Sequence, residues 1–206
     1  VAKRSPWFDP ILLLMAFAYF LFGCGTSSTN VALPSLLLAE PSFGLRSGPE
    51  VARTIGLTQV PYGVMLTAMQ TVGYIRLTKS SVSDQACITV SGLLLGLSTA
   101  LFSLSTERHH LFLLYTLNGG AMGLFFGAYL NLPNAYVATV YPEAIAQARS
   151  VPFPFYHLGN FLGPLMLPLL GERFFRTGWL VAGGLQWLSV ALILVIASRL
   201  AEATRA

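Results

Sequence analysis

Apolar residues occur in six long runs along the chain, separated by short polar segments. The runs cover residues 11–38, 55–74, 86–104, 111–140, 151–170 and 178–197, and every charged side chain lies outside them. A helix of about 20 apolar residues crosses a hydrocarbon layer of about 30 Å and satisfies its own backbone hydrogen bonds there. The pattern predicts an all-α membrane protein, with six transmembrane helices in a single bundle over residues 1–206.

The composition favours the same class. The chain is 54% hydrophobic and only 10% charged, whereas about a quarter of the residues are charged in an ordinary soluble domain. Its net charge is +4, but the basic residues are scattered between apolar runs, so no nucleic-acid partner is expected. Cys24 and Cys87 both lie inside apolar runs and suit small buried side chains better than a disulfide or metal pair. We expect no metal and no cofactor, and a lipid bilayer around the chain.

The lengths of the runs indicate an internal repeat. The first and fourth runs extend to about 28 to 30 residues, and the other four stay near the 20 or so needed to cross a membrane. A long run followed by two short ones therefore occurs twice, over about residues 9–104 and 111–200. Two repeats of three helices must have opposite orientations in the membrane, because three is odd, and many secondary transporters are built from such inverted repeats.

Polar side chains at membrane depth concentrate on the first and fourth runs. Hydroxyls and amides are costly there unless they pair with a neighbouring helix or line a water-filled cavity. Each one alone is typical of an interhelical hydrogen bond, but a set at equivalent places in two repeats predicts a shared solute path. The candidates for this path, which include one tyrosine from an aromatic stripe on the fourth run, are Thr26, Ser27, Asn30, Asn118, Tyr129, Asn131 and Asn134.

Small residues recur at a spacing that places them on one helix face. Gly119, Gly123 and Gly127 repeat every fourth residue in the fourth run, and Gly159 and Gly163 do so in the fifth, followed by Pro164. A face without side chains lets a neighbouring helix approach backbone to backbone. These residues are predicted to pack helices together, with Pro164 bending the fifth helix.

His157 is the one residue with a titratable imidazole or carboxyl group inside an apolar run. A neutral imidazole that is hydrogen-bonded to Tyr156, Asn160 or a backbone carbonyl would be structural. The alternative is a proton relay, because an ionisable residue at membrane depth usually has a functional role. The residues leave both readings open.

Two stretches resemble the major facilitator superfamily of transporters. The segment 63–79, with Gly73, Arg76 and Lys79, resembles the end of the second helix of a repeat and its turn into the third helix. Tyr141-Pro142-Glu143 with Arg149 resembles the turn after the fourth helix, and Gly159-Asn160-Phe161-Leu162-Gly163-Pro164 resembles the pattern of the fifth. Glu143 and Arg149 join the first three as candidate residues of the gating turns.

The resemblance implies a function and a partner. Members of this superfamily have twelve helices in two halves and bind their solute between them. This chain would then be one half, which we expect to be the C-terminal one, loosely similar to drug and solute antiporters. It would transport a small organic solute by alternating access, with a second six-helix half as its partner, and it would not be an enzyme.

Two other classes remain open. Ser27 or Ser28 with His157 could imitate the serine and histidine of an intramembrane protease, although the pair falls on the first and fifth helices. The gating motifs are eroded, so a membrane scaffold or a degenerate transporter without transport activity is the other alternative.

Overall fold

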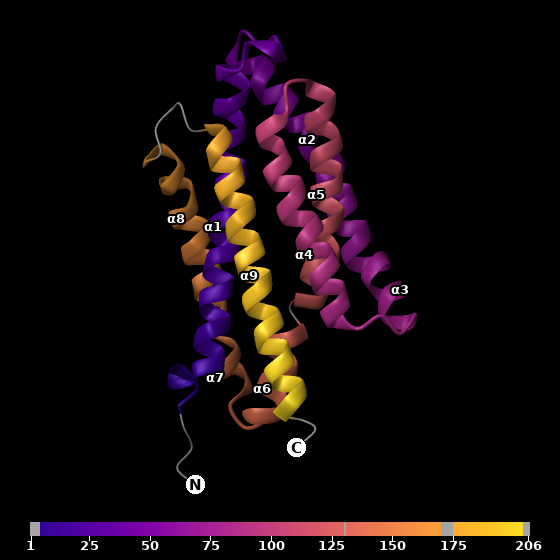
Figure 1. Cartoon of the computed structure of the whole chain (residues 1–206), viewed down its shortest axis with the longest axis vertical. Coiled ribbons are helices and arrows are strands. Elements are labelled where there is room, and N and C mark those ends of the chain that lie inside the picture. Colours follow the sequence, from indigo (N-terminus) through magenta and orange to yellow (C-terminus); the bar gives the residue numbers. More distant parts are fainter. Residues whose placement is uncertain (1–4, 130, 170–174, 204–206) are drawn as a thin grey trace.

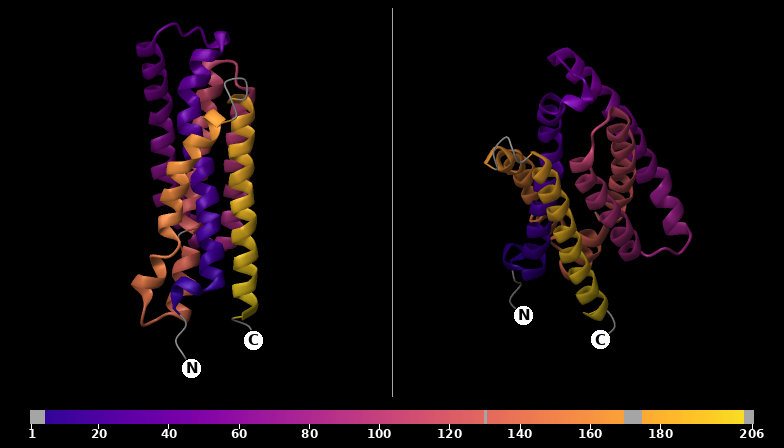
Figure 2. Two further views of the ribbon diagram at one scale, coloured as in Figure 1. Left: turned by 90° about the vertical axis from the view of Figure 1, so that its left-hand side faces the viewer. Right: turned by 45° about the horizontal axis from the view of Figure 1, so that its top comes forward.

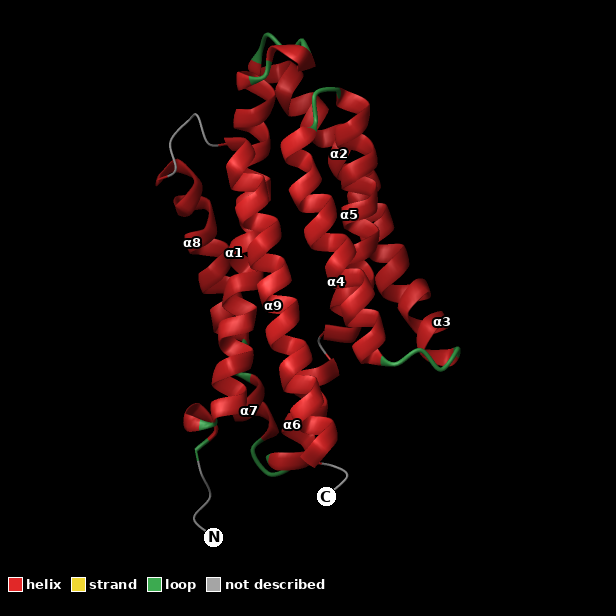
Figure 3. Ribbon diagram, in the orientation of Figure 1, coloured by secondary structure: helices red, strands yellow, loops and turns green. Residues whose placement is uncertain are grey.

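The computed structural model describes residues 5–129, 131–169 and 175–203, and these residues fold into helices joined by short loops, with no strand among them (Figure 3). The prediction of an all-α protein is therefore confirmed for this part of the chain. Following the order of the sequence, the elements are η1 (Pro6–Phe8), α1 (Pro10–Ala39), η2 (Pro41–Phe43), α2 (Gly48–Ala68), η3 (Met69–Gly73), α3 (Tyr74–Lys79), α4 (Asp84–Leu101), η4 (Phe102–Leu104), α5 (Arg108–Tyr129), α6 (Asn131–Val140), α7 (Ile145–Arg149), α8 (Phe153–Leu169) and α9 (Phe175–Ala203).

Short polar residues determine where several helices begin. The carboxylate of Asp9 accepts hydrogen bonds from the first backbone N–H groups of α1, and Pro10 occupies the first helical position. Ser47 and Ser83 cap α2 and α4 in the same way, through the N–H groups of Glu50 and Ala86. Such side chains satisfy donors that have no partner inside the helix.

Within the described residues, four helical segments are long and apolar enough to span a membrane. They are Pro10–Thr29, Asp84–Leu104, Arg108–Val140 and Arg176–Ser198, as expected for a multi-pass membrane protein. The other two predicted runs correspond to α2, which starts with a charged turn containing Glu50 and Arg53, and to α8, of which 17 residues are described. The predicted length rhythm is wrong for the second and sixth helices, because helix continues without a break through α2, η3 and α3, and α9 comprises 29 residues.

The long helices run alternately up and down (Figure 1). In that view α1 begins and α9 ends at the lower end of the bundle, and η2 lies at the upper end. α1 lies between α8 and α9, as the left view of Figure 2 shows, and packs against both. α5 packs in turn against α2 and α4, and α4 packs against α9. Two groups of three helices therefore meet along α4 and α9.

These packing partners follow a rule of exchange between two triplets. We define the first triplet as α1, α2 with α3, and α4, and the second as α5 with α6, α8 and α9. In this order α1 corresponds to α5, α2 to α8 and α4 to α9. When each helix is replaced by its counterpart, the α1–α8 contact becomes α5–α2 and the α1–α9 contact becomes α5–α4. The α4–α9 contact stays the same. The first helix of each triplet thus packs mainly on the second and third helices of the other triplet.

Glycine allows the closest of these contacts. A Cβ atom at Gly159 of α8 would overlap the backbone carbonyl of Phe20 on α1, and one at Gly163 would overlap the backbone of Cys24. On the counterpart helices, Cβ atoms at Gly119 and Gly123 of α5 would overlap backbone carbonyls of α2. Gly127 lies against the ring of Tyr74, and Pro164 is half-buried on α8. α1–α8 and α5–α2 are thus both backbone-to-backbone interfaces.

The outer surface of the helices is apolar. Large exposed side chains occur along every long helix, with Leu57, Val60 and Val64 on α2, Leu93, Leu94 and Leu97 on α4, and Phe161 and Leu165 on α8. Several polar side chains are buried instead, among them Ser91, Thr99 and Gln186, and the free thiols of Cys24 and Cys87 are buried too. This distribution suits a helix bundle surrounded by lipid.

Replacing Gly159 with leucine should disrupt the α1–α8 interface, because the added side chain would meet the backbone of Phe20. We expect the variant to lose about 1 to 3 kcal/mol of stability. It should unfold at a lower temperature in detergent, as measured by tryptophan fluorescence. Gly184→Leu is the matched control, because a Cβ there meets nothing within 4 Å. Equal losses for the two variants would contradict the close contact.

Candidate functional site

Aromatic rings fill the space between α1 and α5. Tyr19 stacks on Tyr129 with ring centroids 4.5 Å apart, and Phe22 stacks on Phe125 at 4.8 Å. All four rings are buried. Tyr156 of α8 lies 6.2 Å from Phe22. We call these five residues the aromatic seam; it joins the first helices of the two triplets by side chains rather than by backbone.

A buried carboxylate, that of Asp9, lies at the lower end of α1. Asp9 is only 7% exposed, and its Oδ2 accepts hydrogen bonds from the hydroxyls of Tyr136 and Tyr141, each at 2.7 Å. Its Oδ1 caps α1 by accepting from the N–H groups of Ile11 and Leu12. Burial acts to raise the pKa of Asp9, but these hydrogen bonds outweigh it and hold the pKa below the ordinary value of 3.8. The charged carboxylate therefore ties the start of α1 to the end of the fourth predicted span.

Two arginines make the corresponding contacts at the upper end. Arg108, at the start of α5, donates from Nε to the carbonyl of Phe43 at 2.9 Å, just after the end of α1. Arg176 pairs with Glu40 and also donates to the carbonyl of Ser103 at 2.7 Å. The hydrogen bond from Arg176 holds the pKa of Glu40 below its ordinary value. The antiparallel pair α1 and α5 is thus held at both ends.

The described path residues of α1 donate to backbone carbonyls. Thr26 is half-buried and its hydroxyl donates to the carbonyl of Phe22 at 2.8 Å. The hydroxyl of Ser27 donates to the carbonyl of Gly23 at 2.8 Å and comes within 3.5 Å of that of Gly159. Ser28, two residues along the helix from Thr26, donates to the carbonyl of Gly163 on α8 at 3.1 Å. The side chain of Asn30 lies outside the described part of the structure.

Asn118 is buried against α4. Its amide donates to the hydroxyls of Ser98 at 2.9 Å and Thr99 at 3.0 Å, and reaches the carbonyl of Leu95 at 3.5 Å. The side chain is 7% exposed. The amide therefore links α5 to its neighbour within the same three-helix group.

Asn131 belongs to a third polar group, near the lower end. Its amide donates to the hydroxyl of Tyr74, which in turn donates to Asp84 at 2.7 Å. Asn131 is exposed and Asn134, one turn further along α6, is half-buried. The structure thus places Ser27 at the α1–α8 interface, Asn118 at α4–α5 and Asn131 at the contact of α3, α4 and α6. Tyr129 belongs to the aromatic seam.

The candidate gating residues lie mostly in helices. Gly73 closes the π-helix η3, and Arg76 and Lys79 belong to α3, so the expected turn at these positions is wrong and the chain turns after Lys79. Helix continues because the segment contains no proline, and one glycine does not stop it. Glu143 lies in the exposed loop after α6, and Arg149 is the exposed last residue of α7, a short helix that the sequence did not predict.

His157 lies on the exposed side of α8. Its ring contacts Tyr156 edge to face, with centroids 5.5 Å apart. No hydrogen bond of its imidazole to another described residue is present. The structural role and the proton relay both stay predictions for this exposed imidazole.

The sequence did not single out several buried polar groups around the seam. Ser189 of α9 donates to the carbonyl of Ala18 at 2.8 Å, and Gln186 packs against Gly25 of α1. Among the described residues, the Oε1 atom of Gln186 and the hydroxyl of Tyr19 are buried without a hydrogen-bond partner. Such groups are costly in a protein interior and are usually satisfied by water or a ligand. Their only signal in the sequence was a glutamine in the middle of an apolar run.

No protein-family model matches this chain, and neither do the curated proteins or the solved structures with which it was compared. The resemblance to the major facilitator superfamily therefore rests on the short motifs of the sequence.

Asp9→Asn should separate the charge at position 9 from its role as a helix cap, because asparagine also caps helices well. The folded-state pKa lies below 3.8, so the charged form stabilises the fold above about pH 4, and this contribution is lost as the pH falls through the lowered pKa. We expect Asp9→Asn to lower the free energy of unfolding by about 2 kcal/mol at neutral pH. The fall of this free energy at acid pH, which we call the acid limb, should be less steep in the variant.

The measurement is thermal unfolding in detergent between about pH 3 and about pH 7. Glu107→Gln, which removes an exposed carboxylate at the other end of α5, is the control and should leave the acid limb unchanged. An acid limb that is as steep in Asp9→Asn as in the parent chain would contradict the role given to Asp9.

Proposed function

We propose that this chain is a six-helix unit of a secondary transporter, built from two inverted repeats of three helices. The observation that supports this most is the exchange of packing partners, in which α1–α8 corresponds to α5–α2 and α1–α9 to α5–α4. Internal repeats of opposite orientation are typical of secondary transporters, which alternate access by moving one repeat or bundle against another. A scaffold has no need of such a relation between its helices.

Helix direction and the end contacts agree with an inverted relation. α1 runs from the lower to the upper end in Figure 1 and α5 runs back, as an odd number of helices per repeat requires. Asp9 before α1 contacts Tyr136 near the end of the fourth predicted span. Arg108 at the start of that span contacts Phe43, just after the end of α1. The start of each first helix thus contacts the end of the other.

The solute of this proposal is a small organic molecule with aromatic or weakly polar character. Rings occupy the space between α1 and α5, so the solute would bind beside this unit, between it and a second six-helix unit, as the resemblance implies. Half-buried Thr26 and Ser27 on α1 are the side chains we propose for its path. Buried Asn118 is assigned to packing, because α4 already engages its amide.

The alternatives are weaker on specific grounds. An intramembrane serine protease needs a serine within hydrogen-bond reach of a histidine. Ser27 and Ser28 donate to backbone carbonyls instead, and His157 is directed outward from α8. A scaffold or degenerate transporter stays as the second candidate, because Leu77 and Thr78 stand where the turn of the superfamily usually has an Asp-Arg pair.

Solute counterflow tests the proposal directly. The chain is reconstituted into liposomes at a density that lets six-helix units pair, and the vesicles are loaded with an unlabelled probe. Three aromatic probes of different charge are used: ethidium, p-aminohippurate and arbutin. A carrier should accumulate external labelled probe transiently without an energy source, because alternating access exchanges one molecule for another.

Two threonine variants provide the matched comparison. Thr26→Val removes a half-buried hydroxyl from the proposed path, and we expect it to change the counterflow rate. Thr116→Val removes a hydroxyl bonded in the same way, to the carbonyl four residues earlier on α5, and it should leave the rate unchanged. Counterflow of none of the three probes, by a folded chain, would contradict the proposal and favour the scaffold.

A further inference from the structure

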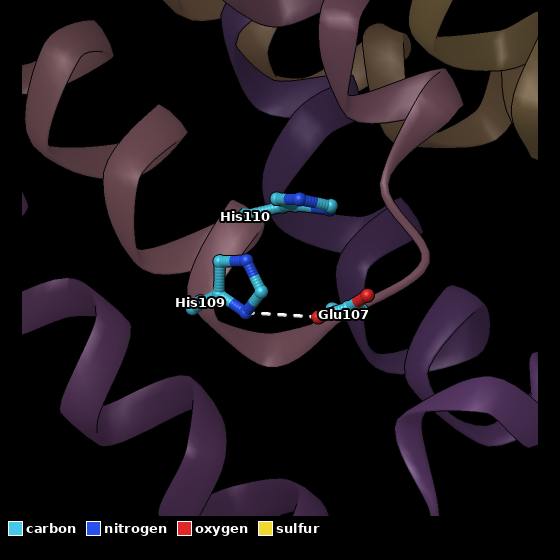
Figure 4. Close-up of side chains that lie close together, drawn as sticks. All are labelled: Glu107, His109 and His110. Carbon is cyan, nitrogen blue, oxygen red and sulfur yellow. Dashed lines mark ion pairs between the residues drawn. The ribbon is translucent and has the colours of Figure 1, made fainter.

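A cluster of metal-ligating side chains lies at the upper end, away from the residues of the proposed solute path. Glu107, His109 and His110 occupy the turn before and the first residues of α5, and Figure 4 shows their side chains gathered on one side of that turn. One ligand atom from each residue lies within 4.8 Å of the others. Nδ1 of His109 is 3.0 Å from Oε2 of Glu107, and the two imidazole centroids are 4.3 Å apart.

The donor set matches a particular class of cation. Two imidazole nitrogens and one carboxylate oxygen are ligands that Zn²⁺ takes in open sites, with water in the remaining position. With metal–ligand bonds of about 2.1 Å, the donors of a tetrahedral site are about 3.4 Å apart. Separations of up to 4.8 Å can close to this value by rotating the three side chains.

The backbone of the turn is held in place by contacts that leave the three ligands free to rotate. Arg108, between Glu107 and His109, donates from Nε to the carbonyl of Phe43. The N–H groups of His110 and Leu111 both donate to the carbonyl of Glu107, and Leu111 is fully buried. A turn that is fixed in this way loses little further entropy when it binds an ion.

We propose that Glu107, His109 and His110 form a binding site for one divalent transition-metal cation of the Zn²⁺ class, at the end of the bundle opposite the start of α1. Hard cations such as Mg²⁺ prefer all-oxygen ligands, so the imidazoles select against them. The positive end of the α5 dipole opposes a cation at this position, and the single carboxylate offsets it. The site is therefore weaker than a closed four-ligand zinc site, and exchangeable.

The site can be tested on the untagged full chain in detergent. The chain has three histidines, and the third, His157, is exposed on α8, so His157→Ala is a matched control. Zn²⁺ binding is measured by competition with a chromogenic chelator, and Cu²⁺ serves as a spectroscopic probe whose electron paramagnetic resonance spectrum reports coordinated nitrogens. Mg²⁺ is the negative control.

The parent chain and His157→Ala should each bind one equivalent of Zn²⁺ with the same affinity and give a Cu²⁺ spectrum with two imidazole nitrogens. His109→Ala, His110→Ala and Glu107→Gln should each weaken Zn²⁺ binding about tenfold or more. Glu107 and His109 are exposed and His110 is half-buried, and changes outside a buried core leave the fold intact. Affinity that is unchanged in His109→Ala and His110→Ala, or that falls as much in His157→Ala, would overturn the proposal. The outcome does not depend on whether the chain transports a solute.

Discussion

Backbone-to-backbone contact at glycine is the constraint on which the arrangement of the helices depends. Gly159 and Gly163 bring α8 against α1, and Gly119 and Gly123 bring α5 against α2. In lipid there is no hydrophobic drive for helices to associate, so close packing and interhelical hydrogen bonds have to hold them together. The same device at both places gives the two triplets equivalent interfaces, and the remaining contacts, α1–α9, α5–α4 and α4–α9, complete the bundle.

Polar side chains stabilise the helix bundle further by hydrogen bonds between neighbouring helices. Ser28 reaches the carbonyl of Gly163, and Asn118 bonds two hydroxyls of α4. The antiparallel pair α1 and α5 meets through rings rather than backbone, and its ends are held by Asp9 below and Arg108 above. Motion between α1 and α5 would leave the glycine interfaces intact and would separate the stacked rings and these end contacts. The proposed alternating access would use this division between rigid pairs and separable ends.

The helices could be predicted from the sequence because apolar length and small-residue spacing are local signals. The run 11–38 corresponds to α1, and the glycines spaced every fourth residue lie on packed faces. The partners of Asn118 and Ser28 could not be predicted, because any polar residue in a span can face one of several neighbours. Asp9 was missed since it precedes the apolar run, where its only signal was the Asp-Pro pair of a helix start. The continuation of helix through Arg76 and Lys79 was missed because a resemblance to a turn was preferred over local helix propensity.

Disulfide cross-linking tests the exchanged packing most directly. In a Cys87→Ala background, native Cys24 of α1 is paired with Asn160→Cys on α8, and Met65→Cys on α2 is paired with Gly120→Cys on α5. A Cβ at Gly120 lies 3.5 Å from Cε of Met65, and a Cβ at Gly159, the residue before Asn160, lies 2.9 Å from the backbone nitrogen of Cys24. Oxidation in the membrane should link both pairs efficiently. Linkage of Met65→Cys to Cys24 and of Asn160→Cys to Gly120→Cys, as packing in sequence order would give, would contradict the exchange of partners.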